Sequence, residues 1–166
     1  MVASQAALSR GGAGAARAIL TGGLVAGAID ITYACVFSYL RRGTPPARIL
    51  QSVASGALGP PAFQGGAATA ALGLLFHFLI ALAWAALYCA SSRRLTALAR
   101  RPYLCGVAYG LLIYAAMNYA VIPLSAAPFG APPPWSAAFN TGIVVHMLGI
   151  GLPVALAARR YSNPPA

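Results

Sequence analysis

The chain has 166 residues, of which 60% are hydrophobic and only 7% are charged. Soluble domains carry about 25% charged residues, so this composition excludes an ordinary soluble domain and indicates a membrane protein. The net charge of +10 comes from eleven arginines set against one acidic residue, Asp30. It does not indicate nucleic-acid binding, because most arginines stand in pairs beside apolar runs, as expected of charges that orient a membrane protein.

The N-terminal segment, residues 1–17, is small and polar and is expected to lie in the cytoplasm. The first predicted span covers residues 18–40, and a bilayer needs about 20 apolar residues. A cleaved signal peptide is the alternative, because Arg10 and Arg17 precede the apolar run. The run is too long for a signal peptide, however, and it contains Asp30.

A short helix is predicted at about 45–57, within the connection that follows the first span. Thr44-Pro45-Pro46 is typical of a helix start, with a hydroxyl cap and then proline in the first turn. Ile49, Leu50, Val53, Ala54 and Ala57 recur at helical spacing, with polar side chains on the opposite side. Such a helix is too short to span a bilayer and is expected to lie on the membrane surface or dip into it.

Three further spans are predicted, at about 69–90, 103–124 and 137–158. An arginine-rich turn joins the second to the third, an uncharged loop rich in proline and alanine joins the third to the fourth, and Pro153 is expected to interrupt the fourth. The sequence therefore predicts an all-α polytopic membrane protein with one domain, residues 18–158. Its four transmembrane helices form an up-down bundle, with the short interfacial helix in the first outer loop.

Arginine counts predict the orientation. The side that holds both termini and the second loop carries eight arginines, whereas the opposite side carries Arg41, Arg42 and Arg48. Both termini, including the tail at 159–166, are therefore expected in the cytoplasm, with the chain in a bacterial inner membrane.

Four polar side chains are predicted to share one depth: Asp30, His77, Asn118 and His146. They lie about 1.5, 3, 6 and 3 Å from the centres of their spans, all towards the outer side. A carboxyl at the centre of a spanning helix costs about 2.5–3.5 kcal/mol on insertion scales. Ionisable residues there are functional-site hypotheses by default, although each can also serve as packing glue between helices.

Six glycines are expected at close helix contacts: Gly23, Gly27, Gly73, Gly106, Gly110 and Gly142. The first and third spans each carry a Gly-xxx-Gly pair, and the second and fourth each carry a Gly-xxx-His motif. This echo is consistent with two helical hairpins in parallel repeat, which is one route to a binding site between repeats.

Three segments carry a resemblance to known proteins: QSVASGALG at 51–59, FQGGAATAALGLLFH at 63–77 and MNYAVIPLS at 117–125. They resemble a widespread group of small bacterial inner-membrane proteins that have four helices and no assigned activity. The resemblance implies bacterial origin and the four-helix fold, and it implies no function.

Three functions remain open from the sequence. The first is an inner-membrane protein whose polar layer handles protons or a small polar solute, with the bilayer and a homodimer or larger membrane complex as partners. The second is a bis-histidine protein with haem b between His77 and His146, since helical bundles build cofactor sites from facing side chains. The third is an accessory or assembly subunit of a larger membrane complex.

An enzyme has little support. One carboxylate is present, no Gly-x-Ser-x-Gly or phosphate-binding loop occurs, and the three cysteines have neither a disulfide framework nor zinc spacing. No catalytic residue, metal ligand or resident cofactor is therefore expected outside the haem alternative.

Overall fold

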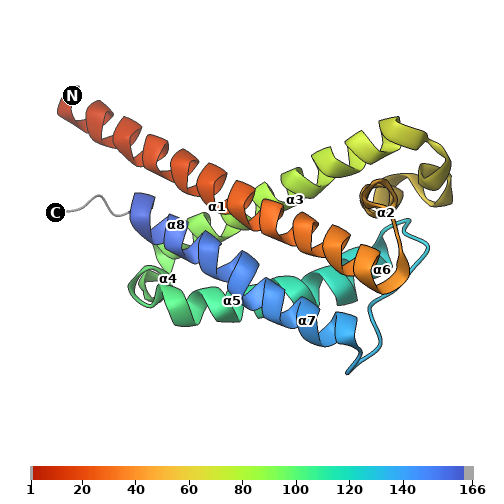
Figure 1. Ribbon diagram of the computed structural model, residues 1–166. Helices are drawn as coiled ribbons and strands as arrows, with labels where there is room; N and C mark the ends of the chain where they lie inside the picture. The colour runs from red at the N-terminus through yellow and green to blue at the C-terminus, as the bar shows by residue number, and fades with distance from the viewer. Residues whose placement is uncertain (1, 163–166) are drawn as a thin grey trace.

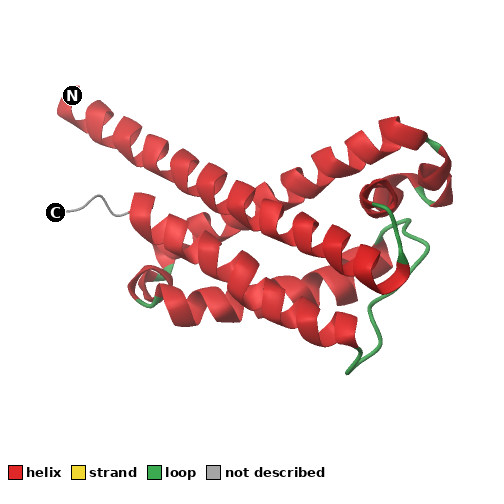
Figure 2. Cartoon of the chain, in the orientation of Figure 1, coloured by secondary structure: helices red, strands yellow, loops and turns green. Residues whose placement is uncertain are grey.

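The computed structural model describes residues 2–162 and the side chains of residues 12–161. Throughout the described residues the chain forms helices joined by turns and loops, without β-strands (Figure 2). The first half contains α1 (Val2–Arg42), α2 (Pro46–Leu58), the 3₁₀-helix η1 (Pro60–Gln64), α3 (Gly66–Arg94) and α4 (Thr96–Arg100). The second half contains α5 (Pro102–Ala116), the π-helix η2 (Met117–Val121), α6 (Ile122–Leu124), α7 (Ala137–Val145), the π-helix η3 (His146–Gly151) and α8 (Leu152–Ser162).

Four helical segments are long and apolar enough to cross a membrane: Gly12–Arg42, Gly66–Arg94, Pro102–Leu124 and Ala137–Tyr161. They alternate in direction, so α4, the start of α1 and the end of α8 lie at one end of the bundle (Figure 1). We call this the terminal end. The opposite end, which carries α2 and the loop at 125–136, is the loop end. The predicted four-helix membrane bundle with a short helix in its first interhelical loop is confirmed, and the chain is a multi-pass membrane protein.

The helix boundaries differ from the prediction mainly at the terminal end. The first helix begins at Val2 rather than near residue 18, because residues 2–17 contain no proline and are rich in alanine, the strongest helix former. The second spanning helix continues to Arg94, and the predicted turn between the second and third spans contains the short helix α4.

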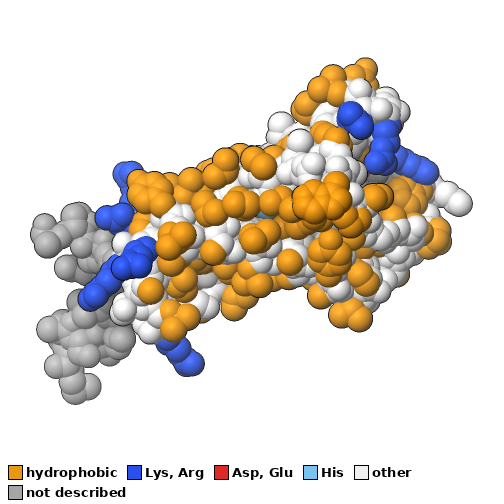
Figure 3. Space-filling view, turned by 90° about the horizontal axis from the view of Figure 1, so that it is seen from below, with side chains coloured by type: hydrophobic (Ala, Val, Ile, Leu, Met, Phe, Trp, Pro, Cys, Tyr) orange, Lys and Arg blue, Asp and Glu red, His pale blue; other side chains and the backbone are white. Residues whose placement is uncertain are grey.

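The side chains on the surface are sorted as a membrane protein requires. Figure 3 shows a face on which arginines gather at the two ends and hydrophobic side chains cover the length between them. Large apolar residues such as Leu20, Leu24, Leu79 and Leu111 are exposed along this length. Lipid rather than water is the solvent that suits them.

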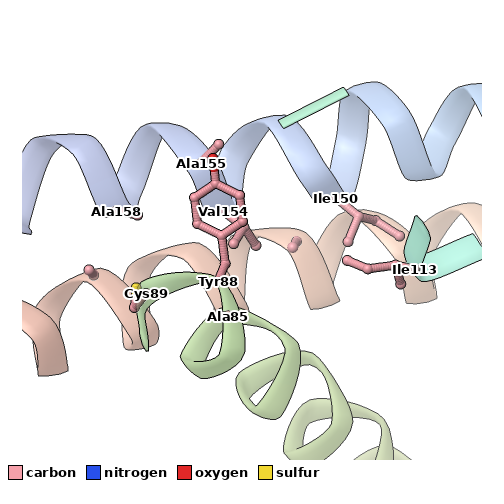
Figure 4. Close-up of a cluster of buried hydrophobic side chains, with 10 residues drawn as sticks. Ala85, Tyr88, Cys89, Ile113, Ile150, Val154, Ala155 and Ala158 are labelled. Atoms are coloured by element: carbon pink, nitrogen blue, oxygen red, sulfur yellow. The ribbon is translucent and has the colours of Figure 1, made fainter. Parts of the chain in front are cut away.

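The terminal half of the bundle is densely packed around Tyr88 of α3, whose side chain is fully buried. Figure 4 shows its ring pointing towards Val154 and Ala155 of α8. The phenolic oxygen donates to the backbone oxygen of Leu98 at 3.1 Å, so the buried hydroxyl is paired. Small residues also let α1 approach α8 closely: a Cβ on Gly22 would lie 3.2 Å from the Cα atom of Val154.

Helices α1 and α3 cross at Gly23 and Gly27, and they diverge towards the loop end (Figure 1). At the crossing a Cβ on Gly23 would lie 2.8 Å from the Leu82 side chain, and one on Gly27 would lie 3.0 Å from the Phe78 ring. These glycines therefore let the two backbones approach closely, as predicted for both.

Helix α2 runs across the bundle and packs against the diverging part of α3 (Figure 1). Its predicted span is confirmed within one residue, but Pro45 occupies the N-cap and the expected Thr44 hydroxyl cap is not formed. The polar side of α2 also turns inward in part, with Gln51 and Ser55 buried. Gln51 Nε2 donates to the backbone oxygen of Gly66 at 3.0 Å, which explains why an amide rather than an apolar residue lies there.

Both π-helical segments precede a proline by two residues, Pro123 after η2 and Pro153 after η3. Proline within a helix lacks the N–H and clashes with the carbonyl of residue i−4. The wider π turn accommodates that clash without breaking the helix. Pro153 was expected to interrupt the fourth span; the helix instead continues through it to Ser162.

Candidate functional site

A cavity of about 360 Å³ lies between the spanning helices, and its walls include all four predicted polar-layer residues, Asp30, His77, Asn118 and His146. The residues belong to four different spanning helices, so the fold brings together positions as far apart as 30 and 146 in the chain. The cavity has the size of small-molecule sites, which are about 300–1,000 Å³.

The cavity runs from mid-membrane to the loop end. Its lining along α1 extends from Ala26 to Arg42, which corresponds to about 24 Å along the helix axis. Val53 of α2 and Pro132 of the long loop contribute to the wall near the loop end, and Arg42 there is exposed.

Aromatic side chains close the cavity towards the terminal end. Trp84 lines the cavity, and its backbone oxygen accepts a 2.8 Å hydrogen bond from the Tyr109 hydroxyl. The Tyr109 ring packs edge-on against Trp84 and Tyr88, with ring centroids 6.1 and 4.8 Å apart. Beyond these rings lies the packed core around Tyr88, so the end of the cavity nearer the terminal end is bounded by packed side chains.

His77 bonds across the helix crossing. Its Nε2 lies 2.8 Å from the backbone oxygen of Gly27 on α1. A carbonyl can only accept, so Nε2 carries the proton and Nδ1 is left as an acceptor. The glycine-mediated approach of α1 and α3 places this carbonyl within reach.

His146 and Asn118 each bond one turn back on their own helix. His146 Nδ1 lies 2.9 Å from the Gly142 backbone oxygen, so its Nε2 is the remaining acceptor. Asn118 Nδ2 donates to the Tyr114 backbone oxygen at 2.9 Å and leaves Oδ1 unbonded within the described residues. Each residue lies at or next to the start of a π-helical segment, a feature often found at functional sites.

Asp30 is half-buried in the cavity wall. Across the part of the chain whose side chains are described, its carboxylate has neither a hydrogen bond nor an ion pair. A direct pairing of the Asp30 carboxyl with His77 or His146 is therefore not the arrangement found.

Sequence reasoning missed the tyrosines of the site. Tyr33 follows Asp30 by one helical turn, and its hydroxyl lies 2.6 Å from Thr141 Oγ1 on α7. Tyr114 precedes Asn118 by one turn, packs edge-on against His146 at 5.2 Å, and has a buried hydroxyl with no partner among the described residues. The three- and four-residue spacing from the polar-layer positions is the signal that could have found both.

The predicted glycines serve two kinds of contact. Gly106 and Gly110 of α5 face the backbone of the fourth spanning helix. In each hairpin the helix with the Gly-xxx-Gly pair therefore crosses the helix with the Gly-xxx-His motif. Gly73 faces the Leu50 backbone of α2, whereas Gly142 faces the Tyr114 ring. The two hairpins thus share the contact made by the Gly-xxx-Gly pair and differ in the contact made by the glycine of the Gly-xxx-His motif.

The donor set does not favour haem. In the arrangement found, His146 leaves its Nε2 free, whereas the Nε2 of His77 is bonded to a backbone carbonyl. To ligate iron through Nε2, His77 would have to break that hydrogen bond or turn its ring. The haem alternative stays a prediction. Within the described residues, no group of three or more His, Cys, Asp or Glu side chains could hold a metal ion.

Comparison of the chain with protein-family models, with curated proteins and with solved structures found no match. The resemblance to small bacterial four-helix membrane proteins therefore stays a prediction, and the function rests on the geometry of the cavity.

Proposed function

We propose that this protein binds a small polar solute or a proton in its mid-membrane cavity and receives it from the loop end. The observation that carries the proposal is the convergence of the four polar-layer side chains on one cavity that is closed towards the terminal end. A polar group in lipid is costly, and four of them around one space are stabilised when water or a solute occupies it.

The arginine distribution supports a cytoplasmic terminal end and hence a cavity that faces the outer side of a bacterial inner membrane. A chain with access from one side only acts alone as a receptor or binding subunit. For transport it would need a second conformation or a partner that opens the aromatic floor. A homodimer or a larger complex would supply such a partner.

Cysteine accessibility tests whether the cavity admits water and solutes. In a chain whose three native cysteines are replaced, Ala34→Cys places a thiol on the cavity wall one turn from Asp30. Val36→Cys is the matched control, because Val36 lies on the same helix nearer the loop end and is 51% exposed, but lies outside the lining of this cavity. A thiol must ionise to react with a maleimide, and lipid prevents this.

We expect a membrane-impermeant maleimide to modify Ala34→Cys from the loop-end side of intact vesicles and to leave Val36→Cys unmodified. Modification from the terminal-end side alone would contradict the direction of access. An unreactive Ala34→Cys, in a chain that elutes as a single folded species, would contradict the proposal altogether.

A further inference from the structure

We propose that the solute taken by this cavity is a protonated organic amine, a small molecule with an ammonium head and an apolar body. The inference rests on the proposed function and adds the chemical class of the ligand. Three features of the cavity carry it: the hydrogen-bonding groups that remain free, the sign of the charge at mid-membrane, and the nature of the walls.

The free hydrogen-bonding groups of the polar layer are mainly acceptors. His77, His146 and Asn118 each use a donor on a backbone carbonyl, which leaves His77 Nδ1, His146 Nε2 and Asn118 Oδ1. The two oxygens of Asp30 bring the number of acceptor atoms to five. The donors left beside these acceptors are the second amide hydrogen of Asn118 and the Tyr114 hydroxyl. Ser38, Trp84 and Arg42 carry further donors and line the cavity outside the polar layer. A ligand that satisfies this layer must therefore contribute N–H or O–H donors.

The Asp30 carboxylate also favours a ligand that carries hydrogen-bond donors and a positive charge. Asp30 is the one acidic residue of the chain, and its carboxylate is unpaired within the described residues. Each imidazole places one ring nitrogen on a backbone carbonyl, and neither imidazole pairs with Asp30 among the described residues. Arg42 lies twelve residues further along α1, about 18 Å away, at the exposed end where water screens its charge. A cationic ligand would therefore be the counter-ion of Asp30.

The walls fit an organic cation better than a metal ion. Tyr33 and Phe37 follow Asp30 on the same face of α1, with ring centroids 5.4 Å apart, and Trp84 lies on the cavity floor. Aromatic rings attract cations and also cover the apolar part of a ligand. A bare metal ion would instead need oxygen ligands on most sides, and the walls outside the polar layer are mainly apolar.

The test uses Trp84 as a reporter. Trp135→Phe removes the other tryptophan, which is 84% exposed and lies outside the cavity lining. The purified chain is titrated at neutral pH with benzylammonium, and its emission and thermal unfolding are followed. Three ligands of similar shape are compared: benzyl alcohol without charge, benzyltrimethylammonium with charge but no N–H donor, and benzoate with the opposite charge. Trp84→Phe controls for adsorption to the detergent.

We expect benzylammonium to bind most tightly, at least about 10-fold above benzyl alcohol, because hydrogen bonds to a charged group are the stronger ones. Benzyltrimethylammonium should fall between them and benzoate should not bind. Asp30→Asn should weaken benzylammonium binding about 10-fold or more, and Asp30→Glu should retain most of it. At equal ionic strength, sodium chloride should displace benzylammonium no better than choline chloride does.

Binding of benzyl alcohol or benzoate as tightly as benzylammonium would overturn the inference while leaving a solute-binding cavity intact. Stronger competition by sodium than by choline would assign the site to a metal ion instead. If Asp30→Asn fails to fold, the comparison of the four ligands on the chain with native Asp30 still decides the matter. Failure of the proposed function is seen separately, as an unreactive Ala34→Cys.

Discussion

The terminal half and the loop half of the bundle are built from the same spanning helices, yet they are packed in opposite ways. In the terminal half Tyr88 is enclosed by small residues such as Ala85, Ala155 and Ala158. In the loop half α1 and α3 diverge after their glycine crossing, and polar side chains line the space between the helices. The comparison teaches that one glycine crossing can serve as a pivot, with a packed core on one side and a cavity on the other.

The pivot also explains how the polar layer is tolerated. Close approach at the crossing brings the Gly27 carbonyl to His77, and one hydrogen bond then holds the imidazole at the edge of the cavity. The equivalent glycine of the second hairpin, Gly110, lies against the backbone of His146 itself. His146 then donates its hydrogen bond to a backbone carbonyl of its own helix. The same motif thus gives an interhelical bond in one hairpin and a local bond in the other.

The largest expected effect contrasts aromatic residues from the two halves. Tyr88→Ala should destabilise the protein by about 3–5 kcal/mol, because a fully buried ring leaves a cavity that the packed helices cannot fill. Phe37→Ala should cost less than about 2 kcal/mol, because that ring already borders empty space. Thermal and denaturant unfolding in detergent measure both. Equal losses would mean that the loop half is as tightly packed as the terminal half.

An intermediate effect is expected at the glycine contact of the second hairpin, between α5 and the fourth spanning helix. Gly110→Ala should destabilise by about 1–3 kcal/mol, because the added methyl group meets the backbone of His146. Gly12→Ala is the matched control, since nothing lies within 4 Å of its Cβ position and alanine favours a helix by about 1 kcal/mol. The melting temperature should fall for the first variant and stay level or rise for the second. A neutral Gly110→Ala would show that the two helices can separate there without loss.

The smallest effect is expected at the unpaired hydroxyl of the cavity wall. Tyr114→Phe removes a buried group that has no partner among the described residues, so stability should stay unchanged or increase by up to about 1 kcal/mol. Tyr109→Phe removes a hydroxyl that is bonded to the Trp84 carbonyl and should cost about 1 kcal/mol. Unfolding of the two variants side by side is the measurement. A larger loss for Tyr114→Phe would mean that its hydroxyl bonds to an ordered water or solute.

The amino-acid sequence by itself determined the membrane class, the number of spans and the existence of the short helix in the first loop. Long apolar runs bounded by arginine pairs and prolines are local signals, and the lipid environment permits few structures other than helices for them. The sequence also predicts a shared depth for Asp30, His77, Asn118 and His146, because depth depends only on the position of a residue within its own span. All four line the same cavity in the structure.

Only the tertiary structure decided what those residues face. The divergence of α1 and α3, the inward turn of Gln51 and the two π-helical segments depend on contacts between helices far apart in the sequence. The two histidines occupy the same local motif, and their different hydrogen bonds arise from which backbone carbonyl the neighbouring helix brings within reach. Depth is a property of each span alone, whereas a cavity is a property of how four spans cross.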